Sequence, residues 1–102
     1  MNNQQSNEHH WMVLVLFLRK IAEAKKIPQH EIAEKSGLKQ SNISRMFNLQ
    51  YCPNLRTFIS VARAIEVNFF FEDKSEKDNE LNVLFEQAMT ELGRRQDSLK
   101  KN

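Results

Sequence analysis

The stretch from Gln29 to Asn48 constrains the fold of this chain more than any other part of it. Its sequence, QHEIAEKSGLKQSNISRMFN, has a helical pattern on each side of one glycine, Gly37. In the second half, Ile43 and Phe47 share a helical face, because residues four apart lie one above the other. The opposite face collects polar side chains at helical spacing: Ser41, Ser44, Arg45 and Asn48. The pattern predicts two short helices, the second with one face to pack and one face free to bind.

A longer helix is predicted before this stretch, at about residues 11–26. Its core stripe is expected to contain Leu14, Phe17, Leu18 and Ile21. Met12 and Leu16 lie on the face opposite Leu14 and Leu18, so the first half of this helix is apolar almost all round. A helix with that pattern is covered on both sides, either by the C-terminal helix of its own chain or by a second subunit.

Residues typical of helix ends lie at Gly37 and on both sides of it. Pro28 suits a first helical turn, and Gly37 suits the left-handed residue that ends a helix. Asn54 is a good N-cap for a further helix at about 55–65. The buried stripe of that helix is expected to contain Leu55, Phe58, Ala62 and Ile65. With only two Gly and two Pro in 102 residues, the chain lacks the turn residues of an all-β domain, so we expect an all-α fold.

Composition divides the chain into five segments. Residues 1–10 are expected to form a flexible tail, 11–71 the folded domain, 72–80 a charged linker, 81–99 an amphipathic helix for packing or dimerisation, and 100–102 a tail. The run of three phenylalanines at 69–71 is too short to assign. It is either a turn or extended segment that packs under the domain, or an exposed apolar patch.

Charge and cysteine content limit the function classes. The net charge is only +2, but residues 1–71 carry nine Lys and Arg against five Asp and Glu, while 72–102 carry six against eight. The single cysteine, Cys52, cannot form an internal disulfide, and the apolar run 11–18 is far shorter than the ~20 residues that cross a bilayer. We therefore expect a cytoplasmic protein without a membrane segment.

Enzymatic and metal-binding signatures are missing from the sequence. It has no glycine-rich phosphate loop and no grouping of nucleophile, base and orienting residue. The adjacent His9 and His10 lack Cys or carboxylate partners at ligand spacing. We predict a protein that is not an enzyme, with no cofactor, no metal and no small-molecule ligand.

The segment from about Ile27 to Phe69 resembles the Cro and phage-repressor class of helix-turn-helix domains, the xenobiotic-response-element (XRE) family of transcriptional regulators. The resemblance is carried by Gln29, Ile32, Ala33, Gly37, Leu38, Gln40, Ser41, Ile43, Ser44, Arg45, Pro53, Leu55, Ala62, Ala64, Ile65 and Val67. It implies a compact four- to five-helix bundle of the lambda-repressor-like DNA-binding type, here with an additional C-terminal amphipathic helix.

The resemblance also implies roles for individual residues. In this family the third helix enters the major groove with its N-terminal end. The base-reading candidates are Gln40, Ser41, Asn42, Ser44 and Arg45, and the phosphate-binding candidates are Gln29, Lys39, Asn48, Gln50 and Arg56. Gln29 is also expected to brace Gln40. The chemistry agrees independently, since amides pair with adenine, Arg pairs with guanine, and hydroxyls accept either.

Four residues depart from the family pattern. Lys39 stands in place of a serine N-cap, at a cost of ~1 kcal/mol. Phe47 replaces a frequent glutamate. Leu49 and Glu66 replace glycines, and for Glu66 a left-handed conformation costs ~1 kcal/mol.

These features predict a sequence-specific regulator that binds double-stranded DNA, acts as a repressor, and is nucleoid-associated when bound. The alternative is an interaction module on the same fold, antitoxin-like or partner-binding, that has lost its groove contacts. A single domain of this kind gains specificity by dimerising, so we expect a homodimer. The dimerisation candidates are Met12, Leu16, Leu81, Leu84, Phe85 and Leu92.

Overall fold

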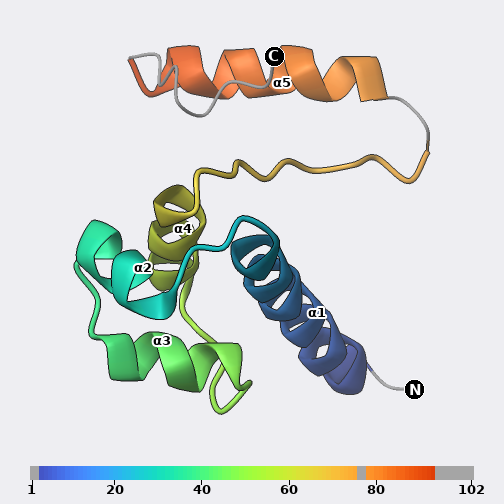
Figure 1. Ribbon diagram of the computed structural model, residues 1–102. Helices are drawn as coiled ribbons and strands as arrows, with labels where there is room; N and C mark the ends of the chain where they lie inside the picture. Colours follow the sequence, from blue (N-terminus) through green and yellow to red (C-terminus); the bar gives the residue numbers. More distant parts are fainter. Residues whose placement is uncertain (1–2, 76–77, 94–102) are drawn as a thin grey trace. The chain divides into compact units, whose positions relative to one another are not determined.

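A computed structural model describes residues 3–75 and 78–93, with side chains for 6–75 and 80–93. The described chain is helical and contains no strand in these ranges (Figure 1). It divides into two units, the first ending at Val67 and the second beginning at Asn68. The all-α fold expected from the sequence is confirmed.

The first unit contains four helices: α1 (Asn3–Ala24), α2 (Gln29–Ser36), α3 (Gln40–Phe47) and α4 (Leu55–Ala64). Helix α2 contacts α3 and α4, and α1 contacts the same two helices from its own side (Figure 1). One hydrophobic cluster joins all four. Its most deeply buried side chains are Val15, Ile32, Ile43, Met46, Val61 and Ile65. Packing in the shared core therefore stabilises all four helices.

Helix α1 differs from the sequence prediction in its start and in its buried face. It begins at Asn3, within the segment expected to be a flexible tail. Its buried side chains are Val15, Leu18 and Ala22. Leu14 and Phe17, expected in the core, are 43% and 62% exposed. The prediction placed the core stripe one step around the helix, because an almost uniformly apolar segment does not indicate by periodicity which side faces the domain.

Helix α4 begins as predicted, because the Asn54 side chain accepts a hydrogen bond from the Thr57 backbone N–H at 2.8 Å. The predicted stripe is only partly correct. Ala62 and Ile65 are buried, but Leu55 is 67% exposed and Val61 takes a core position instead. Helical spacing places Leu55 on the stripe but does not indicate whether a neighbouring helix covers it.

Among the described residues, three other than glycine adopt the left-handed conformation at chain reversals. Lys26 follows α1 with φ 59°, Leu49 follows α3 with φ 62°, and Glu66 follows α4 with φ 61°. The expected left-handed conformation at Glu66 is thus confirmed, and Leu49 adopts the conformation that a glycine there would favour. The Lys25 Nζ donates to the Ile65 carbonyl oxygen at 2.8 Å, which fastens the end of α1 to the end of α4.

The second unit contains α5 (Asp78–Glu91), which begins inside the predicted charged linker. The three phenylalanines at 69–71 lie in a segment without regular secondary structure and are all exposed, and the Phe70 ring meets the Phe85 ring edge-on at 5.5 Å. On α5, Met89 is buried and Leu81 and Phe85 are half-buried. The other two dimerisation candidates on this segment, Leu84 and Leu92, are exposed. The helix ends at Glu91 and Gly93 is left-handed with φ 81°, so the predicted continuation is wrong at residues 92 and 93, and its remainder to residue 99 lies outside the described residues.

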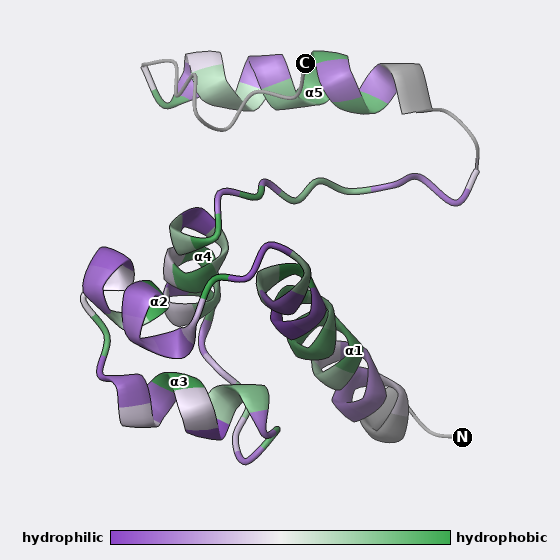
Figure 2. Ribbon diagram, viewed as in Figure 1, coloured by the Kyte–Doolittle hydropathy of each residue, from purple (hydrophilic) through white to green (hydrophobic). Residues whose placement is uncertain are grey.

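Hydropathy varies along and around these helices. Figure 2 shows a long hydrophobic stretch in α1, whereas hydrophilic residues cover most of the visible side of α2. None of the helices in the described residues has the length and apolar character that a membrane crossing requires.

Candidate nucleic-acid interface

The turn between α2 and α3 fixes the direction of α3. Gly37 ends α2 with φ 76°, and its N–H donates to the Ala33 carbonyl oxygen at 2.9 Å. The Leu38 N–H donates to the Ser36 hydroxyl at 3.2 Å, so both backbone donors of the turn are satisfied. Because glycine adopts this conformation without a steric penalty, the chain reverses here within a few residues.

Helix α3 is held against the core by one apolar face. Ile43, Met46 and Phe47 are all buried on that face. An isolated helix of this length is unstable in water, so packing rather than intrinsic propensity must hold it. Its N-cap residue, Lys39, makes no side-chain capping hydrogen bond, which confirms the missing cap expected from the sequence.

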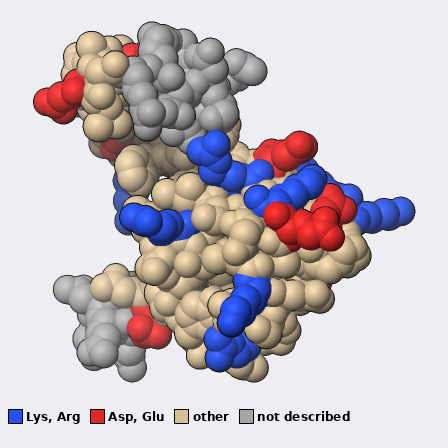
Figure 3. All heavy atoms as spheres, turned by 90° about the vertical axis from the view of Figure 1, so that its left-hand side faces the viewer, with Lys and Arg blue, Asp and Glu red and all other residues tan. Residues whose placement is uncertain are grey.

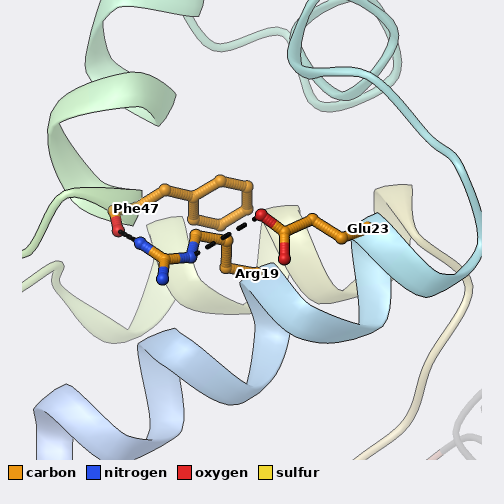
Figure 4. A network of polar contacts seen from close by, with 3 residues as sticks. All are labelled: Arg19, Glu23 and Phe47. Atoms are coloured by element: carbon orange, nitrogen blue, oxygen red, sulfur yellow. Dashed lines mark hydrogen bonds and ion pairs between the residues drawn. The ribbon is translucent and has the colours of Figure 1, made fainter.

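Arg19 of α1 fastens the opposite end of α3. Its Nη1 donates to the Phe47 carbonyl oxygen at 3.0 Å (Figure 4). Its Nε is buried without a hydrogen bond and faces Glu23 Oε2 at 3.9 Å. The last carbonyl groups of a helix lack partners within the helix and carry partial negative charge, so a cationic donor there is favourable. Both ends of α3 are thus positioned by neighbouring elements.

The predicted base-reading residues lie on the outward side of α3. Gln40, Ser41 and Arg45 are exposed, and Asn42 and Ser44 are half-buried. In the described part of the chain, the side chains of Gln40 and Ser41 make no hydrogen bond with other protein groups, so their donors and acceptors face solvent. The expected bracing of Gln40 by Gln29 is not seen between those two side chains, and Gln29 is half-buried.

Asn42, Arg45 and Tyr51 form a local cluster that sequence reasoning missed in part. The Arg45 Nη2 donates to Asn42 Oδ1 at 2.6 Å. The Arg45 guanidinium carbon lies 5.8 Å from the centre of the Tyr51 ring, and the Tyr51 hydroxyl donates to the Asn42 carbonyl oxygen at 3.3 Å. Tyr51 was overlooked because it lies in the loop after α3, where no helical spacing relates it to Arg45. An aromatic residue in a loop next to a basic helix is the only sequence signal it offers.

The predicted phosphate-binding residues surround this helix. Lys39, Asn48, Gln50 and Arg56 are exposed. From Lys35 to Ile65 the chain contains no Asp or Glu, whereas it contains Lys35, Lys39, Arg45, Arg56 and Arg63. Figure 3 shows the side of the molecule on which α2 and α3 lie, with Lys and Arg side chains spread across it and Asp and Glu side chains beside some of them. Lys35 is ion-paired with Glu31 of α2 at 3.1 Å, and the other four basic side chains leave this part of the chain with a net positive charge.

The described residues offer no grouping of three or more His, Cys, Asp or Glu that is placed to hold a metal ion. What the fold does present is a short amphipathic helix that follows a glycine turn, is bonded to Arg19 at its other end, and turns its polar face outward. That arrangement defines a helix-turn-helix domain of the DNA-binding class.

Comparison with known proteins agrees with this class. The family model described as helix-turn-helix matches residues 18–71, which is more than half of the chain. The chain belongs to this family, the Cro and XRE type of helix-turn-helix DNA-binding regulators. Members are typically not enzymes. No curated protein and no solved structure matches the chain.

Proposed function

We propose that this protein is a sequence-specific transcriptional regulator that places the N-terminal end of α3 in the major groove of double-stranded DNA. The observation that carries the proposal is the outward face of α3, where Gln40, Ser41 and Arg45 are exposed on a helix whose apolar face is buried. Polar side chains of these types match the donors and acceptors of base edges.

The basic residues around α3 support a second part of the proposal, that Lys39 and Arg56 bind phosphate. Both side chains are exposed, and no acidic residue lies between them in the sequence. Phosphate contacts position a protein on DNA and carry no sequence information of their own. Asn48, Gln50 and Gln29 are the polar candidates for the same role.

Selection of binding sites from randomised duplex DNA, repeated at two salt concentrations, tests both parts. We expect one preferred sequence to emerge, and affinity for it to fall steeply with salt. Gln40→Ala is expected to relax the preference at particular base pairs. Arg56→Ala is expected to weaken binding to all sequences alike and to reduce the salt slope by about 1. Recovery of no preferred sequence would overturn the proposal of specific readout.

We further propose that the protein acts as a homodimeric repressor. A bound dimer excludes other proteins from its operator, and two copies reading half-sites ~34 Å apart gain specificity that one domain lacks. An apolar face of α1 is the main support: Val13, Leu14 and Phe17 are exposed on it. The predicted residues Met12 and Leu16 are half-buried beside it.

Sedimentation at tens of micromolar, on the order of weak-dimer concentrations, tests the oligomeric state. We expect a dimer that Phe17→Glu converts to a monomer. The matched change Ala24→Glu, which adds the same charge at an exposed position at the end of the same helix, is expected to leave the dimer intact. Monomer alone for the unmodified chain would contradict the dimer proposal without affecting DNA binding by single domains.

The same apolar residues favour a second candidate function, an interaction module that binds a partner protein instead of DNA. Salt separates the two candidates, because an apolar interface is nearly indifferent to ionic strength and a phosphate-binding surface is not. The expected cytoplasmic location, and the expected absence of a small-molecule ligand, a cofactor and enzymatic activity, stay predictions.

A further inference from the structure

We infer that Asn42 and Tyr51 are positioning residues that aim the Arg45 guanidinium at a guanine in the major groove, and that Asn42 itself reads no base. The inference rests on the proposed DNA binding and deepens it. It names the base that the site takes and assigns a role to Tyr51, a residue outside the recognition helix.

The first step of the argument concerns the amide of Asn42. Bidentate pairing of an asparagine with adenine needs its carbonyl oxygen as the acceptor for the adenine N6 amino group. In this protein that oxygen already accepts a hydrogen bond from Arg45 Nη2 at 2.6 Å. Hydrogen bonds with an ionised donor are about twice as strong as neutral ones, so an adenine would have to displace this bond or share the Asn42 oxygen with it.

The second step concerns the freedom of Arg45. A long, exposed arginine on a helix ordinarily samples many rotamers, and ordering it on binding costs free energy. Here Asn42 Oδ1 holds one of its amino groups, and the Tyr51 ring lies within cation–π distance of the guanidinium, at 5.8 Å. The side chain is therefore ordered before DNA arrives.

The third step concerns what the ordered guanidinium can bind. Its five N–H groups form a planar fork, and Asn42 uses only one of them. The remaining donors include pairs that match the O6 and N7 acceptors of guanine, which is the commonest specific contact of arginine with a base. Arg45 is exposed, so this fork is accessible.

Tyr51 couples the loop to the helix in this arrangement. Its hydroxyl donates to the Asn42 backbone carbonyl at 3.3 Å, while its ring is half-buried against the core. The ring under Arg45 is thus fixed by the domain rather than by Arg45 itself. A phenylalanine at this position would keep the ring and lose its attachment to Asn42.

The test uses the full chain and the duplex that the unmodified protein selects from a randomised library. Each base pair of that duplex is changed in turn, and affinity is measured for the unmodified chain and for Arg45→Ala, Asn42→Ala and Tyr51→Phe. The unmodified chain is expected to discriminate one G·C pair by roughly ten- to hundredfold. Replacing that guanine with 7-deazaguanine, which lacks the N7 acceptor, is expected to weaken binding of the unmodified chain and to leave binding of Arg45→Ala unchanged.

The variants are expected to act on the same base pair. Arg45→Ala should abolish the discrimination there and keep it elsewhere, and Asn42→Ala and Tyr51→Phe should each reduce it at that pair alone. Asn42→Ala should have no further effect when combined with Arg45→Ala. Arg63→Ala, which removes an equal charge from an exposed position on α4, should leave the pattern unchanged.

Three outcomes would overturn the inference. If Asn42→Ala relaxes a different pair, and in particular an A·T pair, then Asn42 reads a base itself. If Asn42→Ala and Tyr51→Phe both leave the discrimination intact, neither residue positions Arg45. If Arg45→Ala weakens all duplexes equally, Arg45 binds phosphate, and the inference fails while DNA binding stands. Absence of any duplex binding by the unmodified chain would instead overturn the proposed function together with the inference.

Discussion

At the scale of single residues, the turns of this domain depend on residues that adopt the left-handed conformation. Gly37 does so between α2 and α3, and Leu49 and Glu66 do so after α3 and α4. For residues with a β-carbon this conformation costs roughly 1–2 kcal/mol, whereas glycine adopts it freely. The turn at Gly37 therefore has no backbone strain, whereas the turns at Leu49 and Glu66 do.

Gly37→Ala is expected to lower the free energy of unfolding by about 1–2 kcal/mol. A β-carbon at this position would meet no atom within 4 Å, so the loss comes from backbone conformation alone and not from a clash. Urea denaturation measures it. Gly37→Asn is the matched variant and should lose less, because asparagine tolerates this conformation better than alanine. Equal losses for the two variants would contradict this explanation.

Glu66→Gly is expected to change stability in the opposite direction, raising the free energy of unfolding by up to ~1 kcal/mol. The exposed Glu66 side chain makes no hydrogen bond or ion pair in the described structure, so its removal forfeits little. Glu66→Ala is the control, since it removes the same carboxylate and keeps the strain. Thermal or urea unfolding that shows equal gains for both variants would assign the effect to charge rather than to conformation. Leu49 is unsuitable for this test, because its side chain packs against the core.

At the scale of elements, α3 is a short helix whose orientation is set by its contacts with neighbouring elements. Its apolar face is buried by the core, Gly37 sets its beginning, and Arg19 of α1 binds the carbonyl oxygen of its last residue. A helix that recognises DNA bases must hold its side chains to within a fraction of an ångström of the binding geometry. An isolated helix of this length is not stable enough to do so. The neighbouring helices supply that stability here.

Arg19→Met is expected to lower the free energy of unfolding by roughly 1.5–3 kcal/mol, the range for a hydrogen bond to a charged group. Affinity for DNA is expected to fall as well, with an unchanged dependence on salt, because Arg19 acts through α3 and not through phosphate. Lys20→Met removes the same charge from the next residue, which is exposed. Titrations of both variants at several salt concentrations provide the comparison. A reduced salt slope for Arg19→Met would show that Arg19 contacts phosphate directly.

At the scale of the whole molecule, the two units differ in how they are stabilised. In the described part of the chain, the members of the hydrophobic cluster that unites α1 to α4 lie between Trp11 and Val67. The described part of the second unit has one buried apolar side chain, Met89, and one aromatic pair, Phe70 with Phe85. The first unit therefore contains the core of the DNA-binding domain.

A chain that ends at Asn68 is expected to unfold in one cooperative transition, with a free energy of unfolding within about 0.5 kcal/mol of the complete chain, the range for changes away from a core. Circular dichroism with urea measures the transition in each. Ile43→Ala in the shortened chain is a positive control and should cost about 2–5 kcal/mol. A much larger loss on shortening would show that the second unit stabilises the first.

The sequence by itself determined the class of this protein. The spacing of Ile32, Gly37, Ile43 and Phe47 predicts two short helices at a glycine turn, since helical periodicity and the conformational freedom of glycine are local properties. The N-cap at Asn54 was predictable for the same reason, whereas the left-handed conformation of Glu66 was expected from the family resemblance, in which a glycine stands at this position. Local sequence was sufficient to predict structure wherever the interacting residues are close in the sequence as well as in space.

Only the tertiary structure decided which apolar side chains are buried and which polar side chains form hydrogen bonds or cation–π contacts. In the almost uniformly apolar first half of α1, the position of α3 and α4 buries Val15 and Leu18 and leaves Phe17 exposed. The contact of Arg19 with the end of α3, and that of Tyr51 with Asn42 and Arg45, join residues that no periodicity relates. The segment from Gln29 to Asn48 therefore contains the sequence pattern that predicts α3 and its polar face. Contacts with the rest of the domain determine which side chains of that face are free to bind DNA bases.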